Sequence, residues 1–190
     1  MSGQSSPNSD RNHGRGLVLV GYRGTGKSSV GRILADRTDR PFIDSDVQLE
    51  LRAGRPIASI FAESGEAVFR DWEERIIHET TSADNGAVLA TGGGAVLRET
   101  NRNRLRAFGL VIWLQGSPEV LTSRLCADPK ALADRPALTS AGTLREIAEV
   151  LEARLPLYRA TADFEVETEG KSPEQVAEMI LEICRRSPNA

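Results

Sequence analysis

A glycine-rich segment between an apolar run and a helical pattern constrains the fold of this chain more than any other feature. Residues 21–28 read GYRGTGKS and fit the pattern G-x-x-x-x-G-K-[ST] at each defined position. The apolar run 16–21 predicts a buried strand before it, and residues 28–38 carry apolar side chains at helical spacing after it. A strand, a tight turn and a helix in this order predict the first βα unit of a parallel sheet.

The rest of the chain repeats this alternation of strands and helices. Short apolar runs predict further strands at 40–44, 86–91, 109–116 and 162–168. Helical spacing predicts helices at 46–54, 56–82 with a break at 64–65, 98–108, 117–127, 143–162 and 172–186, with Pro156 bending or interrupting the helix at 143–162. We therefore expect a three-layer α/β/α fold, in which helices cover both faces of a central five-stranded parallel sheet.

Composition places the chain among globular proteins and removes several classes of function. Of its 190 residues, 39% are hydrophobic, and the net charge of −3 indicates no general affinity for nucleic acid. No apolar run approaches the length needed to cross a bilayer. Cys126 and Cys184 form no CxxC pair, so we expect reduced, buried thiols in a cytoplasmic protein. His13 and His78 lack the spacing of metal ligands, and His78 is expected on a helix surface.

Three segments lie outside the predicted alternation. Residues 1–16 are rich in Ser, Asn and Gly and lack the apolar core of a signal peptide, so they predict a disordered tail before a single domain at 17–186. Residues 187–190 form a short C-terminal tail. Residues 127–142 contain two prolines and no firm period, and so long a loop inside a compact domain predicts a mobile lid.

The glycine-rich segment has the chemistry of a phosphate-binding loop. Its backbone N–H groups can surround phosphate oxygens, and the following helix directs its positive end at the same anion. Lys27 can reach the β- and γ-phosphates, where it would be catalytic, and the Ser28 hydroxyl can ligate Mg²⁺. The predicted ATP-binding residues of this loop are Gly24, Thr25, Gly26, Lys27, Ser28 and Ser29.

Two aspartates follow the second predicted strand, in the sequence FIDSD. Asp44 ends the strand, where it can hold Mg²⁺ through water, because this ion prefers oxygen ligands and keeps several waters. Asp46 opens the next helix, where it can cap the helix or accept a hydrogen bond from the hydroxyl group to be phosphorylated. The nearby phosphate-binding loop favours the second interpretation, so Asp46 is predicted to be catalytic.

Three consecutive glycines, Gly92, Gly93 and Gly94, follow the third predicted strand. Without a Cβ, their backbone can approach a ligand closely and offer N–H groups, although a flexible turn would use the same residues. The carboxyl ends of parallel strands meet at one edge of a sheet, so these glycines should lie near the aspartates and the phosphate-binding loop. We predict that they bind the phosphate acceptor, with Gly93 as the most direct contact.

Several segments of the chain together resemble the shikimate kinase family. They are GYRGTGKSSVGR, PFIDSDVQLE, IFAESGEAVFRDWE, LATGGGAVL, DRPAL and ARLPLYR, and the resemblance runs from about Leu17 to the last helix. It implies a P-loop kinase fold with strand order 2-3-1-4-5. It also implies transfer of the γ-phosphoryl group of ATP to the 3-hydroxyl of shikimate, with Mg²⁺ as cofactor, in the biosynthesis of aromatic amino acids. We expect a cytoplasmic monomer whose partners are these small molecules, without nucleic acid or membrane.

The resemblance assigns acceptor-binding roles to residues with more than one interpretation. Arg70 and Arg154 are expected to bind the shikimate carboxylate through their guanidinium groups, although either could form an ion pair on a helix surface. Glu73 is expected to support the arginines. Phe61 and Phe69 would wall the substrate ring or pack in the core.

The family pattern also assigns residues to the nucleotide. Arg135 in the predicted lid would bind ATP and deliver positive charge to the transferred phosphoryl group, and is therefore expected to be catalytic. Arg124 and Lys171 are expected to contact adenine. The stretch between Arg124 and Arg135 is longer than in family members with a short lid.

Two rival functions remain at this stage. A kinase for another small polyol acid, such as gluconate, would share the phosphate-binding loop and the need for arginines. A regulatory protein could bind ATP without transferring phosphate, although the presence of Lys27, Ser28 and Asp46 argues against it. A GTPase is disfavoured because the chain has no Asn-Lys-x-Asp motif.

Overall fold

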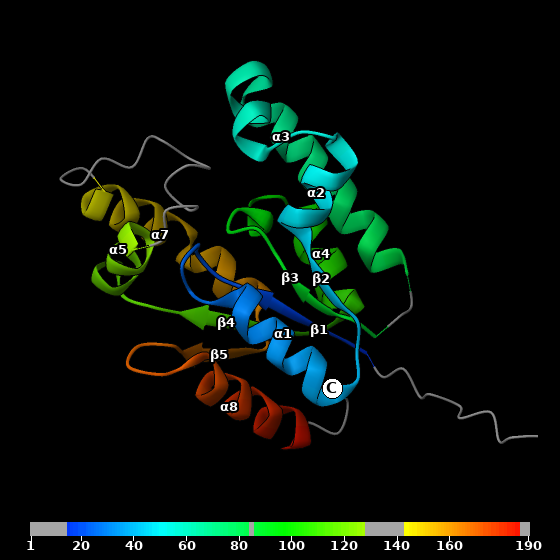
Figure 1. Cartoon of the computed structure of the whole chain (residues 1–190), viewed down its shortest axis with the longest axis vertical. Coiled ribbons are helices and arrows are strands. Elements are labelled where there is room, and N and C mark those ends of the chain that lie inside the picture. Colours follow the sequence, from blue (N-terminus) through cyan, green and yellow to red (C-terminus); the bar gives the residue numbers. More distant parts are fainter. Residues whose placement is uncertain (1–14, 84–85, 128–142, 187–190) are drawn as a thin grey trace, which may run out of the picture.

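Five parallel strands in the order β2-β3-β1-β4-β5 form the centre of the molecule (Figure 1). The computed structural model describes residues 15–83, 86–127 and 143–186. The strands are β1 (Gly16–Val20), β2 (Phe42–Asp44), β3 (Val88–Ala90), β4 (Gly109–Gln115) and β5 (Phe164–Glu167). The predicted strand order and parallel direction are therefore confirmed.

The helices also follow the prediction closely. They are α1 (Lys27–Thr38), α2 (Ser45–Ala53), α3 (Ile57–Ser82), α4 (Glu99–Phe108), α5 (Pro118–Ala127), α7 (Thr143–Thr161) and α8 (Pro173–Arg186), with a 3₁₀ turn, η1 (Ala95–Leu97), that was not predicted. The expected break in α3 is present at Gly65, whose φ of 79° and ψ of 175° lie far from helical values. The prediction that Pro156 might interrupt the helix is wrong, because α7 continues through Pro156 to Thr161.

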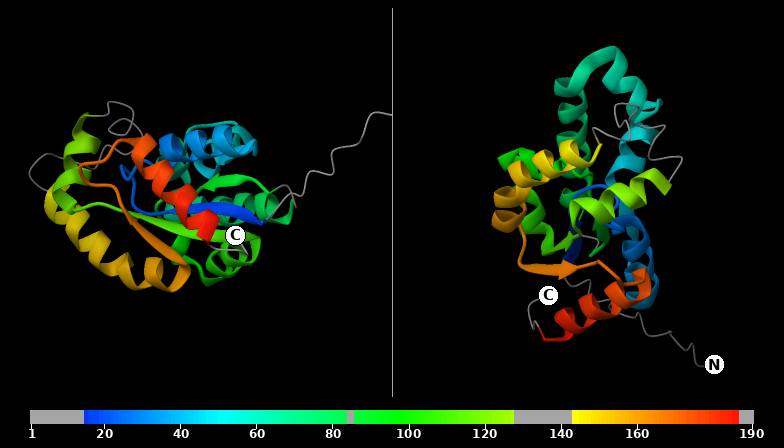
Figure 2. Two further views of the ribbon diagram at one scale, coloured as in Figure 1. Left: turned by 90° about the horizontal axis from the view of Figure 1, so that it is seen from below. Right: turned by 90° about the vertical axis from the view of Figure 1, so that its left-hand side faces the viewer.

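Side chains of β1 alternate between two hydrophobic cores, which gives the fold three layers. Leu17 and Leu19 pack with residues of α1 and α8 on one face of the sheet. Val18 and Val20 pack with residues of α3, α4 and α7 on the other. Figure 2 shows the sheet between these two sets of helices. Because β1 is buried on both faces and lies in the middle of the sheet, the loop that follows it has a rigid base.

Several expectations about the chain ends and surface need adjustment or lie outside the described residues. The expected N-terminal tail ends two residues too late, because Arg15 is described and Gly16 already belongs to β1. The prediction that both thiols are buried is wrong, since Cys126 is exposed and Cys184 is only half-buried. His78 is exposed on α3, as expected. Residues 1–14, 128–142 and 187–190, which include most of the predicted lid and both tails, are not described.

None of the helices within residues 15–83, 86–127 and 143–186 is both long and apolar enough to cross a bilayer.

Candidate active site

The phosphate-binding loop joins β1 to α1, and its lysine side chain forms hydrogen bonds to carbonyl groups of the same loop. Gly24 and Gly26 have φ values of 81° and 89°, which few other residues adopt without strain. The Lys27 ammonium donates hydrogen bonds of 2.8 Å to the carbonyl oxygens of both Gly21 and Tyr22. Burial lowers the pKa of Lys27 to about 8, although the nearby carboxylates of Asp46 and Asp44 act to raise it. The cation is thus held in the loop, where a phosphate would favour its charged form.

Ser28 and Asp44 come together from neighbouring elements. The Ser28 hydroxyl at the start of α1 donates a 2.6 Å hydrogen bond to Oδ2 of Asp44 at the end of β2. The other oxygen, Oδ1, accepts from the backbone N–H groups of Asp46 and Val47, so Asp44 is the N-cap of α2. A hydroxyl and a carboxylate are hard oxygen donors of the kind that Mg²⁺ prefers. The described residues contain no cluster of three or more His, Cys, Asp or Glu side chains that could hold a metal ion.

Asp46 is not the cap of α2, which removes the alternative interpretation of this residue. It lies in the first turn of the helix, and its own N–H is bonded to Asp44. A Cβ added to Gly92 would meet Oδ1 of Asp46 at 2.6 Å, so the carboxylate lies directly against the triple-glycine loop. Its charge also acts on Lys27. Asp46 therefore lies between the phosphate-binding loop and the triple-glycine loop.

Each glycine of the triple-glycine loop, residues 92–94, lies against a different part of the site. A Cβ on Gly94 would be 2.2 Å from Nη1 of Arg70, and one on Gly93 would be 3.2 Å from the backbone nitrogen of Arg23. Gly94 has a φ of −103°, so left-handed backbone does not explain this residue. Close approach explains the three glycines better than a flexible turn does.

Arg70 is anchored by two glutamates. Its guanidinium lies 2.7 Å from Oε2 of Glu73 and 2.9 Å from Oε1 of Glu66. Glu73 is only 2% exposed, whereas the Glu66 side chain is 63% exposed. Burial by itself would lower the pKa of Arg70, but the charges and hydrogen bonds of Glu73 and Glu66 raise it above its ordinary value. The alternative in which Arg70 pairs with a glutamate of its own helix is therefore correct, although the pair with Glu73 is buried. The supporting role of Glu73 in ligand binding stays a prediction.

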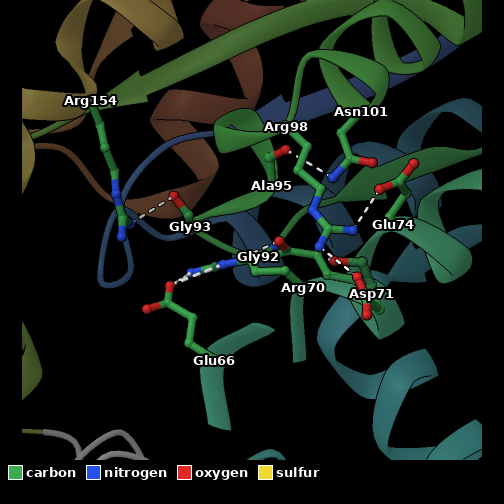
Figure 3. A network of polar contacts seen from close by, with 12 residues as sticks. Glu66, Arg70, Asp71, Glu74, Gly92, Gly93, Ala95, Arg98, Asn101 and Arg154 are labelled. Carbon is green, nitrogen blue, oxygen red and sulfur yellow. Dashed lines mark hydrogen bonds and ion pairs between the residues drawn. The ribbon is translucent and has the colours of Figure 1, made fainter. Parts of the chain in front are cut away.

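Arg154 reaches the triple-glycine loop from α7, on the other side of the site (Figure 3). Its Nη1 donates a 3.1 Å hydrogen bond to the Gly93 carbonyl oxygen, and its guanidinium lies 5.9 Å from the ring centre of Tyr22. Among the described residues it forms no ion pair, so the surface-pair alternative does not hold there. Arg154 is a half-buried cation with a neutral acceptor, in contrast to Arg70.

The two phenylalanines differ in their access to the site. Their ring centres are 4.5 Å apart, and Arg70 lies over the Phe69 ring. Phe69 is fully buried in the cluster formed by α2 and α3, so it packs in the core. Phe61 is half-buried on the edge of the same cluster and is the ring available to wall a ligand.

On the nucleotide side, Arg124 links three segments. From α5 it donates hydrogen bonds to the Gly24 carbonyl oxygen at 3.2 Å and to the backbone and side chain of Thr168. Lys171 lies in the same β5–α8 connection as Thr168. Arg124 therefore lies beside the phosphate-binding loop and joins Thr168 to it. Arg135 lies outside the described residues.

Comparison with known proteins places the chain in a family. The family model described as shikimate kinase matches residues 23–185. A shikimate kinase of Pseudomonas syringae is 46% identical over 172 residues, covering 90% of this chain and 95% of its own length. The chain belongs to the shikimate kinase family. A second family member, the shikimate kinase of Rhodopirellula baltica, is 38% identical over 183 residues and covers 96% of both chains.

Solved structures agree with this family and separate it from other kinases. A shikimate kinase from Acinetobacter baumannii in complex with shikimate has a TM-score of 0.86 and 34% identity, with 93% of this chain and 96% of that chain covered. A gluconokinase from Sinorhizobium meliloti 1021 has a TM-score of 0.58 and 20% identity, with 93% of this chain and 94% of that chain covered. At that identity the gluconokinase shares the fold alone.

The structure adds three residues to the site that lie within the segments resembling the family but were given no role of their own. Ser45, between the two aspartates, is buried and accepts a 2.9 Å hydrogen bond from the Gly92 N–H. Tyr158 donates to the Gly93 carbonyl oxygen at 2.6 Å. Arg23 occupies a variable position of the phosphate-binding loop, and its buried Nε forms no hydrogen bond within the described residues. For Tyr158, the four-residue spacing from Arg154 on one helix was the available signal.

A cavity of about 420 Å³ lies outside this site. It opens between the ends of β4 and β5 and the inner side of α7, and its wall includes Trp113, Leu151 and Glu152. It borders the phosphate-binding loop at Tyr22 and Thr25, but none of the aspartates and arginines described above lines it. The cavity is therefore distinct from the aspartates and arginines that surround the triple-glycine loop.

Proposed function

We propose that this chain transfers the γ-phosphoryl group of ATP to the 3-hydroxyl of shikimate, giving shikimate 3-phosphate and ADP. One observation carries the proposal. Asp46, Arg70 and Arg154 come from three different elements and all reach the triple-glycine loop, directly beside the phosphate-binding loop. This arrangement would allow the carboxylate to bind a hydroxyl and the two guanidinium groups to bind the acceptor's carboxylate, next to the loop that would hold the phosphate donor. Membership of the shikimate kinase family supports the same function.

In the transfer step, the bond between the γ-phosphorus and the bridging oxygen breaks while a bond to the 3-hydroxyl oxygen forms. Asp46 accepts a hydrogen bond from that hydroxyl and takes its proton as the new bond forms. Lys27 and the backbone N–H groups of the phosphate-binding loop neutralise charge on the β- and γ-phosphates. Phosphoryl transfer needs little covalent help, so positioning and charge account for most of the acceleration.

The two arginines hold the shikimate carboxylate in different ways. Arg70 is fixed by Glu73 and Glu66, so it offers its remaining donors from a rigid position. Among the described residues, Arg154 has the Gly93 carbonyl oxygen, the Tyr22 ring and the Tyr158 hydroxyl as partners and no carboxylate, so we expect it to turn more easily than Arg70. One fixed and one adjustable guanidinium can close on a carboxylate as it arrives. Phe61 would lie against the ring, and Gly93 would offer its N–H to a ring hydroxyl.

Ser28 and Asp44 would hold Mg²⁺, the serine directly and the aspartate through water. When bound, the ion would supply positive charge that offsets the charge of the phosphates. The Ser28 oxygen could ligate it through a lone pair while its O–H still donates to Asp44. The support for this assignment is the 2.6 Å approach of two hard oxygen donors beside the phosphate-binding loop.

The remaining nucleotide contacts are proposed from family resemblance. Arg124 and Lys171 would border adenine, and Arg135 would bring its charge to the γ-phosphoryl group from the lid at 127–142. Closure of that lid would exclude water and so suppress hydrolysis of ATP. We further propose a single catalytic domain at 17–186 that acts as a cytoplasmic monomer without nucleic-acid or membrane partners. Light scattering at micromolar concentration would check the monomer.

A coupled assay of ADP release distinguishes the proposal from its rivals. ADP should be released rapidly with shikimate, and only weakly with quinate or gluconate, because the arginines and glycines fit one acceptor geometry. Equal turnover on gluconate would show a different polyol-acid kinase. ATP binding without acceptor-dependent ADP release would show a regulatory protein. Lys27→Met provides the control for contaminating kinases.

The two aspartates of FIDSD should separate in function. Asp46→Asn should lower kcat by about 10²–10⁴-fold while ATP binding stays nearly normal, because the amide is not a base. Asp44→Asn should chiefly raise the Mg²⁺ concentration needed for half-maximal rate. Steady-state kinetics at varied Mg²⁺ measures both effects. Near-normal turnover of Asp46→Asn would contradict the assignment of the site but not of the fold.

A further inference from the structure

The Gly93 carbonyl oxygen receives two donors from the same helix. Tyr158 donates through its hydroxyl at 2.6 Å, and Arg154 through Nη1 at 3.1 Å. The two residues lie four positions apart on α7 and therefore on one face of it. A carbonyl oxygen has two lone pairs, so these donors together fill its capacity.

The two donors differ in how firmly they are held. Tyr158 is fully buried, and its ring stacks on Trp113 of β4 with ring centres 5.4 Å apart. Burial raises the pKa of Tyr158 to about 12, against the opposing effect of Arg154, so the hydroxyl keeps its proton at neutral pH. Arg154 is half-buried and has no carboxylate partner among the described residues. Tyr158 is thus the fixed donor, and Arg154 the exchangeable one.

We infer that Tyr158 is a positioning residue for acceptor binding: its hydroxyl holds the Gly93 carbonyl while Arg154 leaves that carbonyl for the carboxylate of the acceptor. This inference rests on the proposed function. When Arg154 turns to a carboxylate, a charge-assisted bond replaces a bond to a neutral oxygen. The carbonyl it leaves is still bonded to Tyr158, so no buried polar group is left without a partner.

The orientation of this carbonyl also matters for the rest of the triple-glycine loop. The carbonyl of Gly93 and the N–H of Gly94 belong to one peptide plane and point in opposite directions. A fixed carbonyl therefore fixes the Gly94 N–H. A fixed carbonyl also fixes the position of Gly94. The Arg70 guanidinium lies so close to the Cα of Gly94 that there is no room for a side chain. Tyr158 would act on the acceptor through the loop and through Arg154, without touching the acceptor.

Tyr158→Phe tests the inference, because it removes the hydroxyl and keeps the ring on Trp113. We expect KM for shikimate to rise about tenfold, the usual effect of one lost hydrogen bond on binding, with kcat and KM for ATP within about twofold of wild type. With shikimate methyl ester, which does not require Arg154 to leave Gly93 for a carboxylate, the variant and wild type should have the same KM within about twofold. An unchanged KM for shikimate, or an equal effect on the ester, would overturn the inference.

Thr161→Val provides the matched control. Thr161 is also buried on α7, and its hydroxyl donates a 2.6 Å bond to the Leu157 carbonyl oxygen, away from the triple-glycine loop. Its loss should reduce stability without changing KM for shikimate. If Thr161→Val raises that KM as much as Tyr158→Phe does, general loosening of α7 explains the effect and the inference fails.

A measurement of stability tests the same idea without any substrate. Since either donor can satisfy the carbonyl, Tyr158→Phe and Arg154→Met should each lower the melting temperature only slightly, and the double variant by clearly more than the sum. Additive effects would overturn the inference. Wild-type enzyme without shikimate-dependent ADP release would instead defeat the proposed function, and this inference with it.

Discussion

The charges of a few buried side chains and the absence of side chains at the three glycines are the main features of this site at the residue scale. Lys27 is a buried cation held by loop carbonyls, and Asp46 and the triple-glycine loop lie close to it. The glycines leave room that any side chain would fill. Single substitutions that change one charge or add one methyl group should therefore have separable effects on the nucleotide and on the acceptor.

The pKa of Lys27 predicts how ATP affinity depends on pH. In the free protein burial lowers this pKa to about 8, whereas bound phosphates favour the charged form. Above pH 8, ATP binding must therefore be accompanied by protonation of Lys27. The affinity for ATP should then fall by up to about tenfold for each pH unit. Calorimetry from pH 7 to 9.5 in buffers of different ionisation enthalpy measures both quantities. Lys27→Met should bind more weakly but without this slope; an identical slope in the variant would refute the assignment.

Gly94→Ala should damage acceptor binding specifically. The new methyl group would lie 2.2 Å from Nη1 of Arg70, so the guanidinium or the loop must move. We expect KM for shikimate to rise by about 10–100-fold, with KM for ATP nearly unchanged, because a displacement of about 1 Å has effects of this size. Gly93→Ala is the comparison, since its methyl group would meet the Arg23 nitrogen at a milder 3.2 Å. A larger effect at Gly93 would contradict this steric explanation.

At the scale of elements, α3 and α7 bring the two guanidinium groups to the site by different routes. The break at Gly65 divides α3 into a first segment and a second segment that carries Arg70, and both segments contribute to the cluster with α2. On α7, Arg154 and Tyr158 share one face across Pro156. The shape of each helix therefore decides where its arginine lies.

Gly65→Ala should destabilise the protein although the position has open space. Nothing lies within 4 Å of an added Cβ, but φ 79° and ψ 175° belong to a region that is nearly restricted to glycine. We expect a loss of about 1–3 kcal/mol in unfolding free energy, measured by urea denaturation. Gly54→Ala is the control, because its φ of 66° and ψ of 16° are left-handed helical and should have a cost of about 1 kcal/mol. The reverse order would contradict the backbone explanation.

At the scale of the whole molecule, the parallel sheet collects the chemistry at one edge. The phosphate-binding loop follows β1, Asp44 ends β2 and the triple-glycine loop follows β3, and these three strands are neighbours. The proposed acceptor site is completed from the side by α3 and α7. Because the proposed ligands would contact all of these elements, binding should stabilise the fold as a unit.

Shikimate should therefore raise the melting temperature, and the rise should depend on both arginines. At a concentration of about 100 times Kd, linkage predicts about 2.7 kcal/mol of stabilisation. For a chain of this size that is about 5–10 °C in a thermal unfolding scan. Arg70→Met and Arg154→Met should each reduce the shift from shikimate at the same concentration while the shift from Mg-ATP persists. Loss of both shifts in either variant would indicate a folding defect instead.

The extent to which the sequence predicted this site varies with the kind of residue. Lys27, Ser28 and the three glycines were identified because their spacing follows from local backbone chemistry. The roles of Arg70 and Arg154 needed the family resemblance, since spacing on a helix does not reveal which side chain finds a carboxylate. Ser45 and Tyr158 lie in segments that resemble the family, but their contacts were missed, because their partners Gly92 and Gly93 are 47 and 65 positions away.

By itself the sequence determined the alternation of strands and helices, the phosphate-binding loop and the membership of the family, all of which depend on short-range pattern. Only the tertiary structure decided that Asp44, and not Asp46, caps α2, that Arg70 pairs with two glutamates while Arg154 bonds a neutral carbonyl oxygen, and that close approach accounts for the triple glycines. These features depend on sheet register and helix packing, which bring together side chains that are distant along the chain. Local propensity carries no information about such pairs.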